Sequence, residues 1–402
     1  MCIKKSAISM LLAATSLCAT GALSVAQTES AAGTTFKVLH SFTGTDGDLS
    51  FAGLVQGKNG RLYGTTYFGG VNNEGEVFQI TTAGKLKTLH SFCSTGDCTD
   101  GEYSYAVLVQ GADGNFYGTT YLGGSNDDGT IFKMTAKGAL TTLHNFAGAD
   151  GSQPLAGLAA GTDGNFYGTT NLGGSHNAGT VFKISPSGEF TSLHSFCSKA
   201  ACADGQSSYA GLIVATDGNL YGTTLAGGSH GDGTVFKITN SGSFSTLYSF
   251  CSQSGCADGE FPQIGLVQAS NGNLYGATLV GGAYGSGTIF ELTLSGALTA
   301  LYSVCSQGGC PDGNYLYAPL TQAQDGNLYG IMQIGGANNS GTIFKITLSG
   351  ALTTLYSFCS QPSCADGQYP AAGLVQATNG NLYGTTADGG AHSHGTVFSI
   401  TP

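Results

Sequence analysis

The feature that constrains this chain most is a triplet that recurs seven times: leucine or phenylalanine, then tyrosine, then glycine. Successive tyrosines are 54, 50, 54, 54, 54 and 54 residues apart, at Tyr63, Tyr117, Tyr167, Tyr221, Tyr275, Tyr329 and Tyr383. A coil of a parallel β-helix is much shorter, whereas about fifty residues suits one four-stranded blade of a β-propeller. The spacing therefore predicts seven blades.

Each repeat divides into four short strand candidates separated by glycine turns. In the second repeat these candidates are 106–111, 115–120, 130–135 and 139–146. The first two strands meet at an Asp-Gly or Asn-Gly pair, which tolerates the positive φ angles of a two-residue hairpin. Composition agrees, because 66 glycines disfavour helices and 41% hydrophobic residues are too many for a disordered chain.

The chain is cut one strand out of phase with its repeats. The last repeat stops at Pro402 after its third strand, while a spare fourth strand, 36–42, precedes the first repeat. A closed ring explains this, because the N-terminal strand can pair with 396–401 and leave no open edge between first and last blades. We therefore predict an all-β, seven-bladed propeller with four antiparallel strands per blade, forming a single domain over 35–402.

The first 26 residues have the pattern of an export signal. Lys4 and Lys5 precede an apolar run over 7–17, and small residues at 24–26 provide a cleavage site. We expect cleavage near Ala26, a short linker over 27–34, and a mature protein that is secreted, extracellular or periplasmic. The apolar run is shorter than the roughly 20 residues of a membrane span, so we expect none.

Charge excludes two classes of partner. Lys and Arg total 13 against 24 Asp and Glu, a net charge of −11. Such a chain repels the phosphates of nucleic acids and anionic membrane surfaces, so we expect neither as a partner.

The cysteines beyond the signal occur as five pairs, each with four residues between its members. The pairs are Cys93 and Cys98, Cys197 and Cys202, Cys251 and Cys256, Cys305 and Cys310, and Cys359 and Cys364. All lie between the fourth strand of one repeat and the first strand of the next. The two such connections without cysteine, 42–46 and 146–150, are four residues shorter. This favours local disulfides that restrict the longer loops over zinc ligation, for which two pairs must converge.

Any functional site is expected on one face of the ring. The connections from fourth to first strand and from second to third strand emerge together, and these loops are long and variable. The opposite face carries only tight glycine turns. Because variable loops on a rigid scaffold commonly bind ligands, we expect the site at the loop-face mouth of the axial channel.

Candidate ligand-binding residues are the polar and aromatic side chains that differ between repeats on this face. They are Glu102, Tyr103, Tyr105, Gln206, Tyr209, Glu260, Phe261, Tyr315, Tyr317 and Tyr369 after the Asp-Gly pairs, and Asp127, Asp128, His176, His230 and His392 in the other loops. Aromatic rings beside hydrogen-bonding groups suit sugars. The alternative is that the rings only pack at blade junctions and that the loop polar residues are solvated.

No metal or catalytic site is predicted. The repeated Asp of each Asp-Gly pair either caps a turn or contributes to Ca²⁺ binding, but one carboxylate per loop falls short of the six to eight oxygens required. The sequence G-x-S-x-G at 227–231 lacks the strand-turn-helix context of a nucleophile elbow. If the protein were a polysaccharide-acting enzyme, Glu102 and Glu260 would be the candidate acid and base.

The repeat L-Y-G-T-T-x-x-G-G-x-x-x-x-G-T-V-F-K-I, as at 220–238, resembles the GloVer tandem repeat of bacterial secreted and surface proteins. The resemblance covers nearly the whole mature chain and implies an extracellular setting but no activity. We expect a monomeric, non-catalytic binding or scaffold module for a glycan or a cell-envelope partner. The alternatives are a secreted polysaccharide-acting enzyme and a structural or adhesive surface protein.

Overall fold

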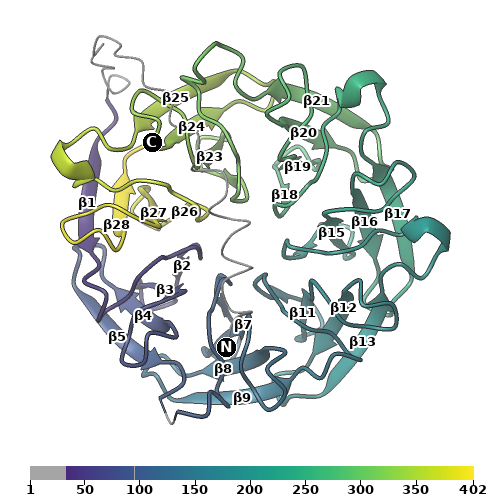
Figure 1. Cartoon of the computed structure of the whole chain (residues 1–402), viewed down its shortest axis with the longest axis horizontal. Coiled ribbons are helices and arrows are strands. Elements are labelled where there is room, and N and C mark those ends of the chain that lie inside the picture. The colour runs from purple at the N-terminus through teal and green to yellow at the C-terminus, as the bar shows by residue number, and fades with distance from the viewer. Residues whose placement is uncertain (1–32, 95) are drawn as a thin grey trace, which may run out of the picture.

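The computed structural model describes residues 33–94 and 96–402; the predicted signal peptide and residues 27–32 of the predicted linker lie outside the described residues. Seven four-stranded antiparallel sheets stand around one axis (Figure 1). This confirms the seven-bladed propeller. Within the described part of the chain, no helix has the length and apolar character to cross a membrane.

The strands of each blade run from the axis outward, with the N-terminal strand as the outermost of blade 7. Their bounds are β2 (Val55–Gln56), β3 (Leu62–Thr66), β4 (Glu76–Ile80) and β5 (Leu86–Ser91) in blade 1; β6 (Val109–Gln110), β7 (Phe116–Thr120), β8 (Thr130–Met134) and β9 (Leu140–Asn145) in blade 2; β10 (Ala159–Ala160), β11 (Phe166–Thr169), β12 (Thr180–Ile184) and β13 (Phe190–Ser195) in blade 3; β14 (Ile213–Val214), β15 (Leu220–Thr224), β16 (Thr234–Ile238) and β17 (Phe244–Ser249) in blade 4; β18 (Val267–Gln268), β19 (Leu274–Ala277), β20 (Thr288–Leu292) and β21 (Leu298–Ser303) in blade 5; β22 (Thr321–Gln322), β23 (Leu328–Met332), β24 (Thr342–Ile346) and β25 (Leu352–Ser357) in blade 6; and β26 (Val375–Gln376), β27 (Leu382–Thr386), β28 (Thr396–Ile400) and β1 (Phe36–Ser41) in blade 7.

The innermost strand of each blade is shorter than predicted. In blade 2 the prediction was 106–111, but β6 contains only two residues. The inner ends of the blades converge on the axis, where the backbone ahead of each inner strand meets the neighbouring blade instead of a ladder partner. A Cβ added to Gly157 in blade 3, for example, would lie 2.4 Å from the carbonyl oxygen of Val107 in blade 2.

The ring closes through the predicted strand pair. β1 runs antiparallel to β28, with Phe36 opposite Ile400 and Ser41 opposite Thr396, and Figure 1 shows the two strands side by side at the two ends of the colour scale. The ring of Phe36 also stacks on Tyr356 of blade 6, with centroids 3.9 Å apart. The N-terminal strand therefore belongs to the core of the last blade.

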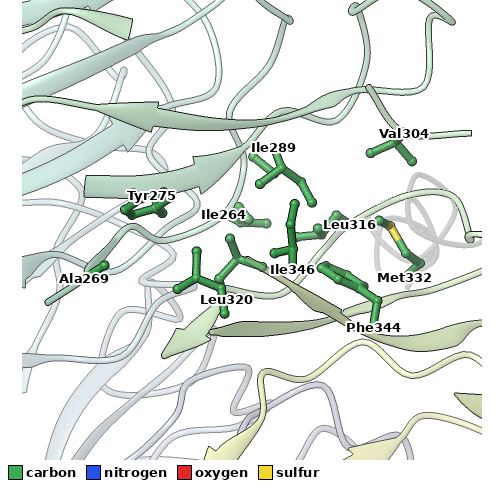
Figure 2. Close-up of a cluster of buried hydrophobic side chains, with 12 residues drawn as sticks. Ile264, Ala269, Tyr275, Ile289, Val304, Leu316, Leu320, Met332, Phe344 and Ile346 are labelled. Carbon is green, nitrogen blue, oxygen red and sulfur yellow. The ribbon is translucent and has the colours of Figure 1, made fainter. Parts of the chain in front are cut away.

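The core lies between neighbouring blades. Figure 2 shows one cluster, in which Tyr275 and Ile289 of blade 5 gather with Phe344 and Ile346 of blade 6. The tyrosine of every triplet is buried, and its hydroxyl bonds the Asp or Asn of its own first hairpin turn, as Tyr117 does with Asp113 at 2.8 Å. The Asp-Gly and Asn-Gly turns thus satisfy the polar end of a core side chain.

All five predicted cysteine pairs form disulfides, each within one connection between blades. Three of these connections contain a single turn of 3-10 helix that ends at the second cysteine. These turns are η2 (Ala200–Cys202), η3 (Ser254–Cys256) and η4 (Pro362–Cys364).

Candidate binding pocket on the propeller axis

The two long loops of each blade are bound to one another on the same face. An antiparallel bridge joins the entry loop to the loop after the second strand, as between Glu102 and Leu122 or between Gln206 and Ala226. Backbone hydrogen bonds also join adjacent blades: the N–H of Tyr103 donates to the carbonyl of Glu74 at 3.0 Å. This face is therefore a continuous scaffold.

A pocket of about 550 Å³ opens on the axis and is lined by all seven blades. Two rings of repeat-equivalent residues form much of its wall. The first ring lies twelve positions before each repeat tyrosine and consists of Phe51, Tyr105, Leu155, Tyr209, Gln263, Tyr317 and Ala371. The second ring lies two residues further on and consists of Gly53, Val107, Gly157, Gly211, Gly265, Pro319 and Gly373. The glycines of the second ring allow the inner strands to approach closely, so side-chain chemistry is concentrated in the first ring.

The pocket carries no charge. All of its lining residues are described, and none is Asp, Glu, Lys, Arg or His. Its polar groups are the hydroxyls of Tyr105, Tyr121, Tyr209 and Tyr317 and the amides of Gln153, Asn171 and Gln263. Pockets of this size with a mostly apolar wall and a few convergent polar groups are typical small-ligand sites.

Aromatic rings form one wall of the pocket. Phe51 of blade 1 stacks on Tyr105 of blade 2 with centroids 5.5 Å apart, and Tyr105 meets Tyr121 edge to face at 5.7 Å. Burial raises the pKa of Tyr105 and of Tyr121 above the ordinary tyrosine value. These hydroxyls therefore remain protonated, neutral donors at physiological pH.

Asn171 is the most buried polar side chain in the wall. It is 7% exposed, and its Oδ1 has no hydrogen-bond partner among the described residues. Its amide bonds the hydroxyl of Tyr209 in blade 4. Burial raises the pKa of Tyr209, whereas this hydrogen bond lowers it. The corner formed by Tyr121, Asn171 and Tyr209 thus combines hydroxyl groups with one unused acceptor.

The family of the chain follows from its repeats. Residues 19–203 and 199–398 match the Gloeobacter/Verrucomicrobia repeat, which confirms the resemblance seen in the sequence. The chain belongs to this family. Comparison with curated proteins finds no match.

Solved structures similar to this member of the Gloeobacter/Verrucomicrobia repeat family share its fold at low identity. Virginiamycin B lyase from Staphylococcus aureus is 14% identical, with a TM-score of 0.60, and the match covers 92% of this chain and 99% of that one. The protein described as the extracellular domain of hybrid two-component system BT3049 from B. thetaiotaomicron is 14% identical, with a TM-score of 0.59, over 91% of this chain and 41% of that one. At this identity the likeness establishes the propeller fold alone.

In this Gloeobacter/Verrucomicrobia repeat protein, three of the predicted site residues line the pocket: Tyr105, Tyr209 and Tyr317. Tyr315 packs against Tyr317, with centroids 6.1 Å apart. Tyr103, Phe261 and Tyr369 lie at blade junctions, where each backbone N–H donates to a carbonyl of the preceding blade.

The predicted polar residues occupy other parts of the loop face. Asp127 accepts a hydrogen bond from the N–H of Gly123, and Asp128 accepts one from Ser152 of the next blade at 2.6 Å. His176, His230 and His392 are exposed on three different blades. Glu102, Gln206 and Glu260 belong to the bridges between paired loops.

The suggested acid and base are not brought together. Glu102 enters blade 2 and Glu260 enters blade 5, and neither lines the pocket. Burial, with Asp232 and Asp258 nearby, raises the pKa of Glu260. The separation of the two glutamates across the ring leaves them without a shared substrate position.

The repeated Asp-Gly aspartates bind the ends of the outer strands. In blade 2, Asp100 accepts hydrogen bonds from the N–H of Cys93 at 2.9 Å and from His90 at 2.8 Å. Among the described residues, two groups bring three potential metal-ligand atoms together: Cys93, Cys98 and Glu102, and Asp232, Cys251 and Cys256. In both groups the two sulfurs are joined in a disulfide, so neither offers the thiolate that a metal requires.

Sequence reasoning missed Tyr121, Asn171 and the two lining glutamines. Tyr121 and Asn171 share one repeat position, four residues after the triplet tyrosine. The complete set at this position is Tyr67, Tyr121, Asn171, Leu225, Leu279, Gln333 and Ala387. This position varies, although the residue before it is threonine in six of the seven repeats and a Gly-Gly pair begins two residues after it in all seven. That variability was the available signal.

Proposed function

We propose that this chain is an extracellular, non-catalytic binding propeller that holds a neutral glycan in its axial pocket. The observation that carries the proposal is the uncharged, tyrosine-lined wall of the pocket. The rings can pack against the C–H faces of a sugar, while hydroxyl and amide groups bond its hydroxyls. An uncharged wall offers no counter-ion to an acidic ligand, so neutral sugars are favoured.

An extracellular location is supported by three features. The N-terminal sequence has the pattern of an export signal. Five disulfides require an oxidising compartment for their formation. Propellers of similar fold occur in proteins described as extracellular domains. We expect the exported chain to act as a monomer.

A non-catalytic role is favoured over a polysaccharide-acting enzyme. Glycoside hydrolysis generally requires two carboxyl groups that flank the scissile bond, about 5–10 Å apart. The pocket wall contains no carboxylate, and Glu102 and Glu260 lie on separate blades.

The test is calorimetric titration of the mature protein with a panel of methyl glycosides and neutral oligosaccharides. We expect at least one to bind, and Tyr209→Ala to weaken that binding at least tenfold. The matched control is Tyr284→Ala, because Tyr284 is 58% exposed and lies outside the pocket. Failure of every neutral sugar to bind at millimolar concentration would overturn the proposal, as would equal effects of the two variants.

A further inference from the structure

The polar groups of the axial pocket are concentrated in a single sector. Tyr105 and Tyr121 come from blade 2, Asn171 from blade 3 and Tyr209 from blade 4. These groups are mutually close: Tyr209 interacts electrostatically with both Tyr105 and Tyr121, and it is hydrogen-bonded to Asn171. A ligand in the pocket therefore meets most of its hydrogen-bonding partners on one side.

Within this sector, Asn171 has a fixed orientation. Its backbone N–H donates to the carbonyl of Gln153 at 3.2 Å, and its side-chain amide bonds the Tyr209 hydroxyl. These contacts leave Oδ1 as the remaining polar atom of the side chain of a residue that is 7% exposed, and Oδ1 has no partner among the described residues. A buried acceptor without a partner is destabilising, so its position here is best explained by a donor that arrives with the ligand.

The unused acceptor is specific to this pocket. The other buried side-chain atoms without a partner in the described chain belong to Glu74, Glu76 and Asp312, and none of these residues lines the pocket. At the same repeat position as Asn171, blades 4 and 5 carry Leu225 and Leu279. The fold therefore does not require an amide at this position.

We propose that Asn171 determines the specificity of the pocket by accepting, at Oδ1, a hydrogen bond from one hydroxyl of a neutral pyranose. This inference rests on the proposed function and adds the atom that selects the ligand. The Tyr209 hydroxyl is bonded to the amide of the same asparagine, and the rings of Phe51 and Tyr105 provide the surface for the apolar face of the sugar. A sugar whose corresponding hydroxyl is absent or methylated lacks the donor and is rejected.

The test compares Asn171→Leu with the wild-type protein. Leucine is the natural residue at this position in two blades, so the variant should fold. The matched control is Gln333→Leu, which removes an amide at the same repeat position in blade 6, outside the pocket wall. Calorimetry with the tightest methyl glycoside of the panel, and with its series of monodeoxy derivatives, gives the affinities. Thermal unfolding gives the stabilities.

We expect Asn171→Leu to weaken binding of the parent glycoside at least tenfold. Its melting temperature should stay close to that of wild type, because the substitution removes an unpaired buried acceptor together with one hydrogen bond to Tyr209. One deoxy derivative should bind weakly to wild type and lose little further affinity in the variant. Gln333→Leu should bind as wild type does. A merely structural role for Asn171 would instead lower the melting temperature and affect all derivatives alike.

Two results would overturn the inference and are distinguishable. If wild type binds the glycoside through Tyr209 but Asn171→Leu binds it equally well, only the role of Asn171 fails. If wild type binds no member of the panel, the proposed function fails together with this inference.

Discussion

The side-chain oxygen of Gln56 in blade 1 accepts a hydrogen bond of 2.9 Å from the backbone N–H of Thr378 in blade 7, 322 residues away. The same contact joins four other pairs of adjacent blades: Gln110 with Lys58, Gln268 with Thr216, Gln322 with Ser270, and Gln376 with Gln324. At the two remaining positions, Ala160 and Val214 cannot form it. The glutamines therefore stabilise the ring on the face opposite the pocket.

Replacing Gln56 with alanine should lower the free energy of unfolding by about 1 kcal/mol, the usual net contribution of one hydrogen bond. The converse change, Ala160→Gln, should raise the free energy of unfolding by a similar amount, because it adds the hydrogen bond between blades that blade 3 lacks. Urea unfolding followed by circular dichroism measures both. If neither variant shifts the unfolding midpoint, the contact contributes nothing to closure of the ring.

Closure by the N-terminal strand can be tested at Phe36. Its ring stacks on Tyr356 of blade 6. Phe190 makes the equivalent contact with His144 of blade 2, with centroids 4.0 Å apart, but its strand directly follows the other strands of blade 3 in the chain. Phe36→Ala and Phe190→Ala should each destabilise the protein by about 2 kcal/mol, the contribution expected for burial of a phenylalanine side chain. A loss of stability in Phe190→Ala alone would show that β1 does not contribute to the cooperative core.

The sequence was sufficient to predict strand pairing but not strand length. The last repeat lacks a fourth strand, and 36–42 is a fourth-strand sequence that precedes the first repeat. The pairing of 36–42 with 396–401 therefore follows from the number of strands. The length of the inner strands could not be predicted, because alternation over 106–111 does not reveal that residues near the axis contact the next blade. Before the inner strand of blade 3 the backbone instead approaches blade 2 so closely that a Cβ at Gly157 would lie 2.4 Å from the carbonyl oxygen of Val107.

The pocket was predicted only in part. The sequence predicts Tyr105, Tyr209 and Tyr317 as candidate site residues because they are aromatic residues that follow the Asp-Gly pairs, and all three line the pocket. Asn171 and Tyr121 were missed because they follow the most regular strand of the repeat. Whether a residue at the end of that strand faces the axis depends on the twist of the blade, which no local pattern encodes.

The disulfides should stabilise the loop face by lowering the conformational entropy of the unfolded chain. Closing a ring of six residues contributes about 2 kcal/mol in the chain-entropy estimate. The double variant Cys197→Ala, Cys202→Ala should therefore lose about that much free energy of unfolding. The denatured, unreduced mature protein should show no free thiol, and ten thiols would contradict the five disulfides.

Strand β4 of blade 1 begins with a buried acid. Glu76 is fully buried and occupies the position at which the other six blades carry threonine. Burial raises its pKa to about 8, against the opposing effect of a hydrogen bond from Thr88, and Asp46 adds to the rise. Its Oε2 has no partner among the described residues.

Because this pKa is higher in the folded protein than the ordinary value of 4.5, folding favours the protonated acid. The associated stability is fully present below pH 4.5 and is lost as the pH rises through about 8. Glu76→Thr should remove that loss, so its melting temperature should exceed that of wild type by more at pH 9 than at pH 5. Glu189→Gln, which changes an exposed acid, is the control. An advantage for Glu76→Thr that is equal at both pH values would contradict ionisation of Glu76 as the cause.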